Sequence, residues 1–485
     1  MLGITTTNAR VGGFRGGIDA DAKTIYNRII ADGGVSDLTR LNFFVKGLKA
    51  IYGDLANVPV CYDAHWIGYK LGSGTGATAG QAAAKLYSLT VAGDAVQATA
   101  ASQPLLLAHN GDNYWWGSGV SGNYCSTPNA AANTLIDNFG IEAFVESYSF
   151  SGSKIISGKY TGDPTTSQFV FRFNGSNLQL IIDKLLVEVA YTSTATVPFS
   201  INQSFYVRFS RNATTGDIKF FTSADGITYT QLGTTVSGLT GSLNSPNTIL
   251  EIGSIVTGTL QNFTGKIKNV KLFKDDSFTT ITQNFNPATY NAATSQTQWT
   301  STTGEIWTIN TGTATTGYKG LLVTKTILMG DGVDDFLTPA AGNTPAVPTT
   351  MYCAFRGWKD NGGLARGVFG SQDANYFIGR FNSSNISTYA GGNTYLNVAT
   401  STDTIKLATY VRRNGTNELQ VNNGSANSVT ENTNTVTSSK VNIFFINAGY
   451  DTAIFSTGIM TGSADTPTQR TAMYNLIRSL NNNAF

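Results

Sequence analysis

The sequence predicts a mainly β protein: two tandem jelly-roll β-sandwiches, a short α-helical N-terminal segment and a C-terminal helix. Three observations support this fold class: few charged residues among many turn formers, strands of alternating aromatic residues, and an internal repeat. Charged residues make up 13% of the 485 residues, whereas about 25% is usual in soluble proteins. Val, Ile, Thr, Tyr and Phe favour strands, and the 52 glycines, with Asn and Asp, favour the turns between them.

Alternation of side chains predicts half-buried strands. Phe169, Phe171 and Phe173 occupy every second position, and residues 205–209 repeat the pattern with Phe205, Val207 and Phe209. Dipeptides that suit tight hairpins occur in both halves of the chain: Asp225-Gly226, Asn414-Gly415 and Asn423-Gly424. Many short strands joined by such turns, with almost no helical period between them, indicate antiparallel sheets packed face to face, for which a jelly roll is the simplest arrangement.

Helices are predicted only at the two ends. Ile25 and Ile29 mark a short helix, and apolar residues from Leu38 to Leu48 recur at spacings of three and four after Ser36, a residue type favoured at the N-cap. Near the C-terminus, Thr466-Pro467-Thr468-Gln469 is a capping-box start with proline at the first helical position. The apolar face that follows it predicts docking onto the second sandwich.

The internal repeat divides the chain into three units. The matching stretches keep their order, and the separation between partners shortens steadily along the chain, as expected for two copies with shorter loops in the second. We therefore expect a helical unit at 1–85, one sandwich at 86–276 and another at 277–485. The matches are Ser126-Thr127-Pro128 with Leu337-Thr338-Pro339, Ala143-Phe144 with Ala354-Phe355, residues 172–178 with 380–386, and Arg211-Asn212 with Arg413-Asn414.

Charge and cysteine content exclude several classes of function. The net charge of +2 is spread without basic runs, so a nucleic-acid partner is not expected. The first 17 residues lack the apolar stretch of an export signal, and the most apolar window, residues 178–190, is too short to span a bilayer, so we expect no membrane insertion. Three widely spaced cysteines argue against a disulfide framework and fit synthesis in a reducing cytosol.

Several stretches resemble one group of proteins. Asp331 to Phe336, Asn284-Phe285-Asn286-Pro287, Trp299 to Glu305 and Gln97 to Pro104 are similar to stretches in concanavalin A-like (laminin-G-like) domains of structural proteins from tailed phages of Bacteroidota hosts. The likeness spans most of the chain. It implies a virion fibre or appendage subunit, assembled in the host cytoplasm and exposed on the particle surface.

The resemblance also implies partners. Residues 1–85 would attach to other virion proteins, the subunit would form a homo-oligomer, with a trimer favoured, and the sandwiches would bind a glycan or protein of the host cell surface. One alternative is a capsid-decorating or connector protein whose sandwiches make only assembly contacts. A second is a virion-borne polysaccharide-degrading enzyme, but the Glu-x-Asp-x-x-Glu motif of retaining glucanases with this fold does not occur. We therefore expect no enzymatic activity.

The candidate ligand-binding residues are Tyr114, Trp115 and Trp116. They fall in a stretch where the first copy is longer than the second, so the common core does not require these aromatic rings. Exposed rings can stack on sugars or anchor an interface. The alternative is that they pack against the N-terminal unit or the neighbouring sandwich.

Asp331, Asp334 and Asp335 are candidate calcium ligands, because calcium often sits at the rims of this fold family and takes carboxylate oxygens. The alternative is a hydrogen-bonded turn. No other cofactor is expected.

Two further groups of residues invite a chemical interpretation. Cys61, Asp63 and His65 alternate as metal ligands would, but a closed zinc site needs four ligands. Glu142 and Glu146 share one face of a strand, as a catalytic pair would, but the repeat does not preserve them, which favours solvated strand positions without a catalytic role.

Overall fold

The computed structural model describes most of the chain. The described residues are 17–72, 82–90, 93–184, 187–292, 294–311, 320–330, 335–342, 348–357, 366–371, 377–382, 385–389, 395–400, 405–413, 415–430, 440–446, 449–450 and 453–481. Within these ranges every strand pairing is antiparallel and the α-helices lie near the chain ends, which confirms the mainly β prediction. None of the helices in these ranges is both long and apolar enough to cross a membrane.

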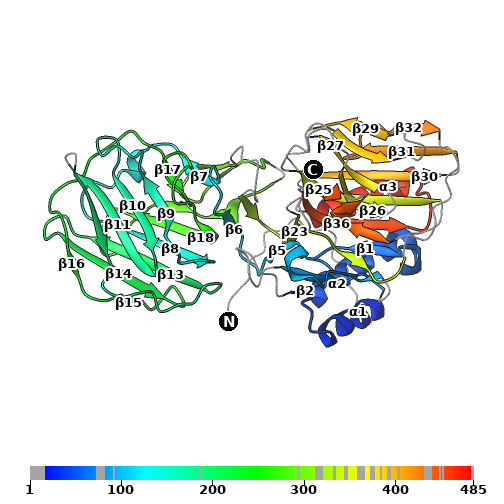
Figure 1. Ribbon diagram of the computed structural model, residues 1–485, viewed down its shortest axis with the longest axis horizontal. Coiled ribbons are helices and arrows are strands. Elements are labelled where there is room, and N and C mark those ends of the chain that lie inside the picture. The colour runs from blue at the N-terminus through cyan, green and yellow to red at the C-terminus, as the bar shows by residue number, and fades with distance from the viewer. Residues whose placement is uncertain are drawn as a thin grey trace.

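Figure 1 shows two lobes side by side along the long axis of the molecule. The lobe coloured cyan to green is the first sandwich, built from two sheets. Sheet I has the order β15-β14-β13-β8-β18-β6-β22, with β16 beside β14 and β19 beside β18. Its strands are β6 (Tyr114–Ser118), β8 (Phe139–Ser147), β13 (Ser204–Arg211), β14 (Asp217–Ser223), β15 (Thr230–Gln231), β16 (Val236–Ser237), β18 (Thr264–Phe273), β19 (Ile281–Phe285) and β22 (Leu321–Val323).

Sheet II of the first sandwich has the order β12-β11-β10-β9-β17-β7-β21-β20. The chain passes back and forth between sheets I and II, which is the jelly-roll arrangement. The alternation predicted for Phe169 to Phe173 is confirmed, because these rings are buried in the core between the two sheets. The strands of sheet II are β7 (Tyr124–Thr127), β9 (Ser153–Lys159), β10 (Phe169–Asn174), β11 (Asn177–Lys184), β12 (Val187–Thr192), β17 (Leu250–Ile252), β20 (Gln298–Thr300) and β21 (Ile306–Asn310).

In the second sandwich, sheet III packs face to face with sheet IV. Sheet III has the order β32-β31-β30-β25-β36-β23-β5, with β1 beside β36, and sheet IV has the order β29-β28-β27-β26-β33. The strands of sheet III are β1 (Val60–Tyr62), β5 (Leu105–Leu107), β23 (Ile327–Met329), β25 (Thr349–Gly357), β30 (Lys406–Arg413), β31 (Thr416–Val421), β32 (Asn427–Thr430) and β36 (Ala453–Thr461). Those of sheet IV are β26 (Arg366–Ser371), β27 (Phe377–Asn382), β28 (Asn385–Tyr389), β29 (Tyr395–Ala399) and β33 (Val441–Ile443).

Two smaller groups of strands complete the second lobe. Sheet V has the order β2-β3-β4-β24, and β34 pairs with β35 as a separate hairpin. Their bounds are β2 (Tyr69–Leu71), β3 (Ala83–Leu86), β4 (Ala95–Val96), β24 (Thr338–Pro339), β34 (Phe445–Ile446) and β35 (Gly449–Tyr450).

The helices cover the outer face of sheet III. α1 (Ala20–Ala31), α2 (Leu38–Tyr52) and α3 (Pro467–Leu480) bury their apolar faces against Tyr352 and Ile459 of that sheet. The capping box predicted for α3 is confirmed, since the Thr466 hydroxyl accepts the Gln469 N–H. The N-cap of α2 is Asp37 and not Ser36, because the Asp37 carboxylate accepts the Arg40 N–H.

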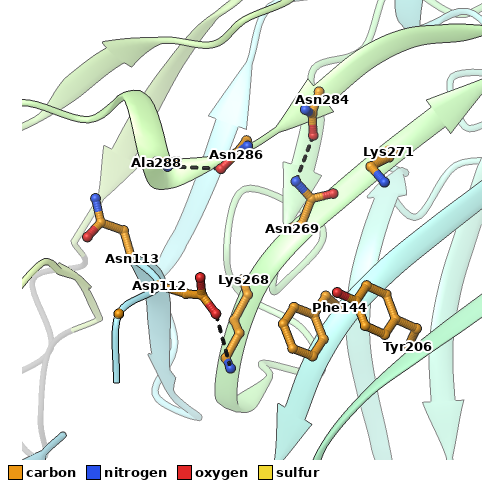
Figure 2. A pocket seen from close by; sticks show the side chains of 11 residues that line it. Asp112, Asn113, Phe144, Tyr206, Lys268, Asn269, Lys271, Asn284, Asn286 and Ala288 are labelled. Atoms are coloured by element: carbon orange, nitrogen blue, oxygen red, sulfur yellow. Dashed lines mark hydrogen bonds and ion pairs between the residues drawn. The ribbon is translucent and has the colours of Figure 1, made fainter. Parts of the chain in front are cut away.

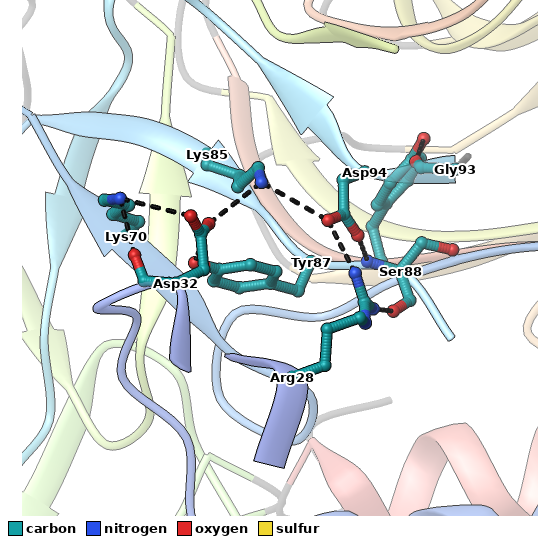
Figure 3. A network of polar contacts seen from close by, with 9 residues as sticks. Arg28, Asp32, Lys70, Lys85, Tyr87, Ser88, Gly93 and Asp94 are labelled. Atoms are coloured by element: carbon teal, nitrogen blue, oxygen red, sulfur yellow. Dashed lines mark hydrogen bonds and ion pairs between the residues drawn. The ribbon is translucent and has the colours of Figure 1, made fainter. Parts of the chain in front are cut away.

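Polar contacts attach α1 to sheet V and to the residues that follow β3 (Figure 3). Asp32, which ends α1, accepts bonds from Lys85 and from the Tyr87 hydroxyl at 2.9 and 2.6 Å. Arg28 pairs with Asp94 at 2.6 Å. The N-terminal helices are therefore part of the second lobe and not a separate unit.

The pairing of strands does not follow the predicted boundaries at 85/86 and 276/277. β19, β20, β21 and β22, all C-terminal to residue 277, pair with sheets I and II, so the first sandwich runs from about β6 to β22. β1 and β5 pair with sheet III, so the second sandwich combines the chain up to β5 with the chain from β23 onward. Local sequence marks strands well, but it does not show which sheet edge each one completes.

The first sandwich is thus inserted between two neighbouring strands of the second. β5 pairs with β23 in sheet III, and β22 pairs with β6 in the corresponding place of sheet I. The two crossings between lobes are short and adjacent. A cluster of side chains from both sandwiches, called here the junction cluster, packs around them: Leu105, Leu107, Tyr114, Trp116, Tyr148, Leu321, Val323, Ile327, Met329 and Ile454.

The two sandwiches have corresponding strand orders, but the matched residues are not all equivalent. The β10–β11 and β27–β28 hairpins turn at the same place, with Asn174 opposite Asn177 and Asn382 opposite Asn385. However, Arg172 binds Gln179 on the outer face of sheet II, whereas Arg380 is fully buried. The side chain of Phe381, the match of Phe173, lies outside the described residues.

β-bulges in β18 and β36 align the central strands differently from the sequence matches. The bulge in β18 falls between the partners of Val145 and Phe144, and the bulge in β36 falls between the partners of Phe355 and Ala354. When the two bulges are superimposed, Phe144 therefore corresponds to Ala354 and not to Phe355. A slip of one residue turns a side chain to the other face of a sheet.

Candidate functional site

A pocket of about 470 Å³ lies on the outer face of sheet I. Its floor comes from β8, β13 and β18, and its walls come from the crossing before β6 and from the chain between β19 and the short 3-10 helix η5 (Pro287–Thr289), as Figure 2 shows. The outer-face pocket, as it is called below, falls in the size range usual for small-molecule sites. It is lined by Gly111, Asp112, Asn113, Phe144, Tyr206, Lys268, Asn269, Lys271, Asn284, Asn286 and Ala288.

Strand alternation places the aromatic floor. Ala143 and Val145 point into the core, so Phe144 between them points outward. Tyr206 lies directly opposite Phe144 on β13, and the two rings stack with centroids 4.2 Å apart and planes 3° apart. Such cross-strand aromatic pairs stabilise a sheet, and because the two rings stack on each other they present apolar ring edges at the pocket floor.

Charged groups cover part of this floor. The Lys268 ammonium lies 4.4 Å from the centre of the Phe144 ring and 3.9 Å from a carboxylate oxygen of Asp112. Burial lowers the pKa of Lys268, and the Asp112 charge opposes this shift. Since the Phe144 ring contacts both Tyr206 and Lys268, a ligand meets ring edges and polar groups here more than an open ring face.

Amide groups make up one side of the pocket. Asn269 Nδ2 donates to Asn284 Oδ1 at 2.9 Å, and this bond leaves Oδ1 of Asn269 and Nδ2 of Asn284 for a ligand. Asn113 is held in place because its Nδ2 donates to the Pro287 carbonyl at 3.0 Å. An amide offers a donor and an acceptor side by side, which matches adjacent sugar hydroxyls that both donate and accept.

Glu142 and Glu146 are both engaged in ion pairs. A carboxylate oxygen of Glu142 lies 2.8 Å from Lys271, and its other oxygen accepts the Tyr229 hydroxyl at 2.7 Å. Glu146 lies 2.9 Å from Lys266 and accepts the Ser204 hydroxyl. Both side chains are buried, at 7% and 6% exposure, so they do not occupy the solvated strand positions that were expected.

The three aromatic residues predicted to bind a ligand are buried. Tyr114, Trp115 and Trp116 are 2%, 0% and 1% exposed. Trp115 belongs to the core of the first sandwich, and Tyr114 and Trp116 belong to the junction cluster. No ring face reaches the surface; Tyr114 and Trp116 instead follow the alternative of packing against the neighbouring sandwich, and Trp115 packs inside its own sandwich. Their place on β6, between two lobes, was not visible in the sequence.

Most of the predicted calcium-binding turn lies outside the described residues. Asp331 and Asp334 lie outside the described residues, and Asp335 is buried. Within the part of the chain that the structure describes, no group of three or more His, Cys, Asp or Glu side chains is placed to hold a metal ion. The calcium site stays a prediction.

Cys61, Asp63 and His65 have separate roles. Cys61 is buried beneath the helices, and Asp63 accepts the Thr457 hydroxyl at 2.6 Å. Nδ1 of His65 accepts the Thr326 N–H, and burial lowers the pKa of His65 to about 2. These groups hold the second lobe together around the crossing chain.

Sequence reasoning did not find the outer-face pocket. Its lining residues come from segments as far apart as Asp112 and Ala288, and only the pairing of β6, β18 and β19 brings them together. Asn284 and Asn286 did occur in a stretch that the resemblance singled out, but nothing local marked them as neighbours of Phe144.

Neither a protein-family model nor a curated protein sequence matches the chain. Among solved structures it is similar to domains LG4-5 of the mouse laminin alpha1 chain, with 8% identity, 73% of this chain and 91% of that chain covered, and a TM-score of 0.31. It is also similar to a putative carbohydrate binding protein from Bacteroides ovatus, with 14% identity, 44% and 58% covered, and a TM-score of 0.30. A third is the Ruminococcus gnavus IT-sialidase CBM40 bound to alpha2,3 sialyllactose, with 10% identity, 33% and 90% covered, and a TM-score of 0.25. At these TM-scores the likenesses carry no argument about ligands.

Proposed function

We propose that this chain is a carbohydrate-binding protein without enzymatic activity, and that it binds through the outer-face pocket of sheet I. The observation that carries the proposal is the combination, in one pocket of suitable size, of an aromatic floor with the amides of Asn269 and Asn284. Sugars present apolar C–H groups and vicinal hydroxyls together; the edges of the stacked Phe144 and Tyr206 rings can contact the C–H groups, and the amides can bind the hydroxyls.

The absence of catalysis is part of the same proposal. Glycoside hydrolysis needs one carboxyl group to donate a proton and a second to act as nucleophile or base. On this face Glu142 and Glu146 are each neutralised by a lysine, Lys271 and Lys266. We expect no release of reducing ends from capsule or cell-wall glycans incubated with the protein. Release of reducing ends would favour the polysaccharide-degrading alternative.

The finer proposal is a bacteriophage fibre or spike subunit, exposed on the virion and oligomeric, with a trimer favoured. The sequence resemblance and the low charge support it. Residues 1–85 would contact other virion proteins, and this region carries exposed apolar side chains on and near α1, at Ile18, Ile30, Val35 and Leu71. The same side chains suit the alternative of a capsid-decorating or connector protein. Electron microscopy of particles labelled against residues 1–85 separates an attached base from a projecting tip.

Binding is tested by glycan-array and calorimetric measurements on Asn269→Ala and Asn284→Ala. Each variant removes an amide at the pocket, and we expect affinity to fall about tenfold, the value of one or two hydrogen bonds. Asn427→Ala is the control, because Asn427 is an exposed amide of the second sandwich. Glycan binding that survives both pocket variants would remove the outer-face pocket from the proposal.

A further inference from the structure

A second pocket lies at the end of the first sandwich where β8 begins and β18 ends. This end pocket has a volume of about 520 Å³, again within the range of small-molecule sites. None of its residues lines the outer-face pocket. It is lined by Asn129, Ala131, Thr134, Leu135, Ile136, Asp137, Asn138, Ser245 and Lys274.

Beneath the end pocket lies a fully buried lysine. Lys159 is 0% exposed, and its ammonium donates to Asn129 Oδ1 at 2.6 Å, Asn133 Oδ1 at 3.2 Å and Thr134 Oγ1 at 3.4 Å. All three acceptors are neutral, and no described carboxylate forms an ion pair with Lys159. Asn129 and Thr134 also line the pocket, so they connect the buried cation to it.

A second buried cation lies under the same pocket. Arg211 is 0% exposed, and its guanidinium donates to the carbonyl oxygens of Asp137, Leu239 and Gly241 at 2.7, 3.0 and 2.6 Å. Its Nε has no hydrogen-bond partner among the described atoms. Carbonyl oxygens satisfy donors but bring no full negative charge.

The carboxylates at this end compensate these cations only in part: the charge of Asp137 acts on Arg211, whose pKa burial lowers, and no carboxylate of the described residues is paired with Lys159. Lys274 adds a third cation at the pocket, against the single carboxylate of Asp137, which accepts the Ser242 hydroxyl at 2.6 Å. Asp275 accepts bonds from its own turn, and Asp276 accepts a bond from Asn212. On β11, burial raises the pKa of Asp183 to about 7.

Burying a cation without a counter-charge is costly, so the charges beneath the end pocket favour an anion inside it. The outer-face pocket differs, because its lysines, Lys268 and Lys271, face Asp112 and Glu142. The remaining lining of the end pocket suits the rest of a sugar. Leu135 and Ile136 are apolar, and Asn138 and Ser245 carry hydrogen-bonding groups.

We propose that the end pocket binds an acidic saccharide, whose carboxylate is drawn by Lys274 at the rim and by Lys159 and Arg211 beneath. This site is independent of the outer-face pocket, and neither depends on the other. It gives the first sandwich two binding places of different charge selectivity.

The test compares two ligands that differ mainly at one carbon. Sodium glucuronate carries a carboxylate where glucose carries a hydroxymethyl group, so calorimetric titration of the full chain with each isolates the charge. We expect glucuronate to bind at least about tenfold more tightly than glucose, because hydrogen bonds to ionised groups are the stronger ones. The affinity for glucuronate falls as salt is raised. Equal binding of the two sugars, or binding of neither, overturns the proposal.

Variants locate the site. Lys274→Gln removes the cation at the rim, and we expect about a tenfold loss of glucuronate affinity. Lys46→Gln is the matched control: Lys274 donates to the Ala131 carbonyl at 2.6 Å, and Lys46 in the second lobe likewise donates to a backbone carbonyl, that of Gly17. Unchanged binding in Lys274→Gln contradicts the proposal. Inorganic sulfate that competes as strongly as glucuronate also contradicts it, by showing a site for simple anions. Asn269→Ala must leave glucuronate binding intact, which separates this result from the fate of the outer-face pocket.

Discussion

Asp183 on β11 shows how one residue can oppose stability in this protein. Its carboxylate is buried, and neither oxygen has a hydrogen-bond partner among the described atoms. Burial, followed by the charge of Glu188 across the strand pair, raises its pKa to about 7. A buried carboxyl group with these neighbours binds its proton far more readily than it does in the unfolded chain.

We expect Asp183→Asn to stabilise the protein at pH 8. There the wild-type carboxylate is ionised and uncompensated, whereas the amide is neutral and of the same shape. The folded pKa is raised, so the wild type regains stability as pH falls from 8 through 7 toward the unfolded pKa. Urea unfolding should show that the free energy of unfolding rises by at least about 1 kcal/mol at pH 8, somewhat less than the roughly 1.4 kcal/mol that a shift of one pKa unit represents. The gain should be smaller at pH 5.5.

A gain for Asp183→Asn that is the same at both pH values would show that the titration of Asp183 does not cause it. Glu188→Gln is the comparison variant, because Glu188 is exposed and its hydrogen bond comes from Tyr160. Its substitution removes only the second cause of the Asp183 shift.

At the scale of elements, α1 is attached by charged contacts in addition to its apolar face. Ala22, Ile25 and Ile29 are buried, as the helical spacing of the two isoleucines predicted. At the end of the helix, Asp32 meets Lys70, Lys85 and Tyr87 (Figure 3). The Tyr87 hydroxyl and Lys85 lower the pKa of Asp32 to about 2.

We expect Asp32→Asn to weaken the docking of α1 at neutral pH. The folded pKa is depressed, so the contribution of Asp32 is present above its unfolded value of 3.8 and is lost as pH falls toward 2. Hydrogen exchange of α1 amides should therefore be faster in the variant at pH 7, and the difference between the two proteins should shrink as pH falls from 3.8 toward 2. Asp54→Asn is the control, since Asp54 caps a separate turn. Equal exchange at pH 7 would contradict the role of Asp32.

For the whole molecule, the insertion decides which fragments fold. The first sandwich is one continuous stretch from β6 to β22, with its own core. The second needs β1 and β5 from the N-terminal part, and α1 and α2 cover its outer sheet. The junction cluster joins the two around the crossings.

We expect a fragment of residues 114–323 to unfold cooperatively by heat, as seen by circular dichroism. A fragment of residues 277–485 should not, because it lacks β1 and β5 and leaves the apolar face of sheet III uncovered. The fragment 114–323 lacks the second sandwich, which covers Tyr114 and Trp116 in the full chain. Because these rings become exposed, we expect this fragment to be less soluble than the full chain. A cooperative transition in the second fragment, or none in the first, would contradict the boundaries given by strand pairing.

Local features of this fold could be predicted from the sequence, whereas the pairing of distant strands could not. The rings of Phe169, Phe171 and Phe173 and the capping box at Thr466 were predicted correctly, because period and caps are local properties. The pairings of β19 to β22 were not predicted, and the exposed role given to Trp115 and Trp116 was wrong. Pairing depends on which sheet edge is free, and a sequence does not state that.

By itself, the sequence determined what these residues are: strands, turns and capped helices in a chain with few charged residues. Only the tertiary structure decided that Tyr114 and Trp116 are packing residues, that Asn269 meets Asn284, and that Lys159 and Arg211 lie under one pocket. The physical reason is range. Backbone preference and side-chain period act over a few residues, whereas burial and electrostatic fields are set by segments that meet only after the sheets have paired.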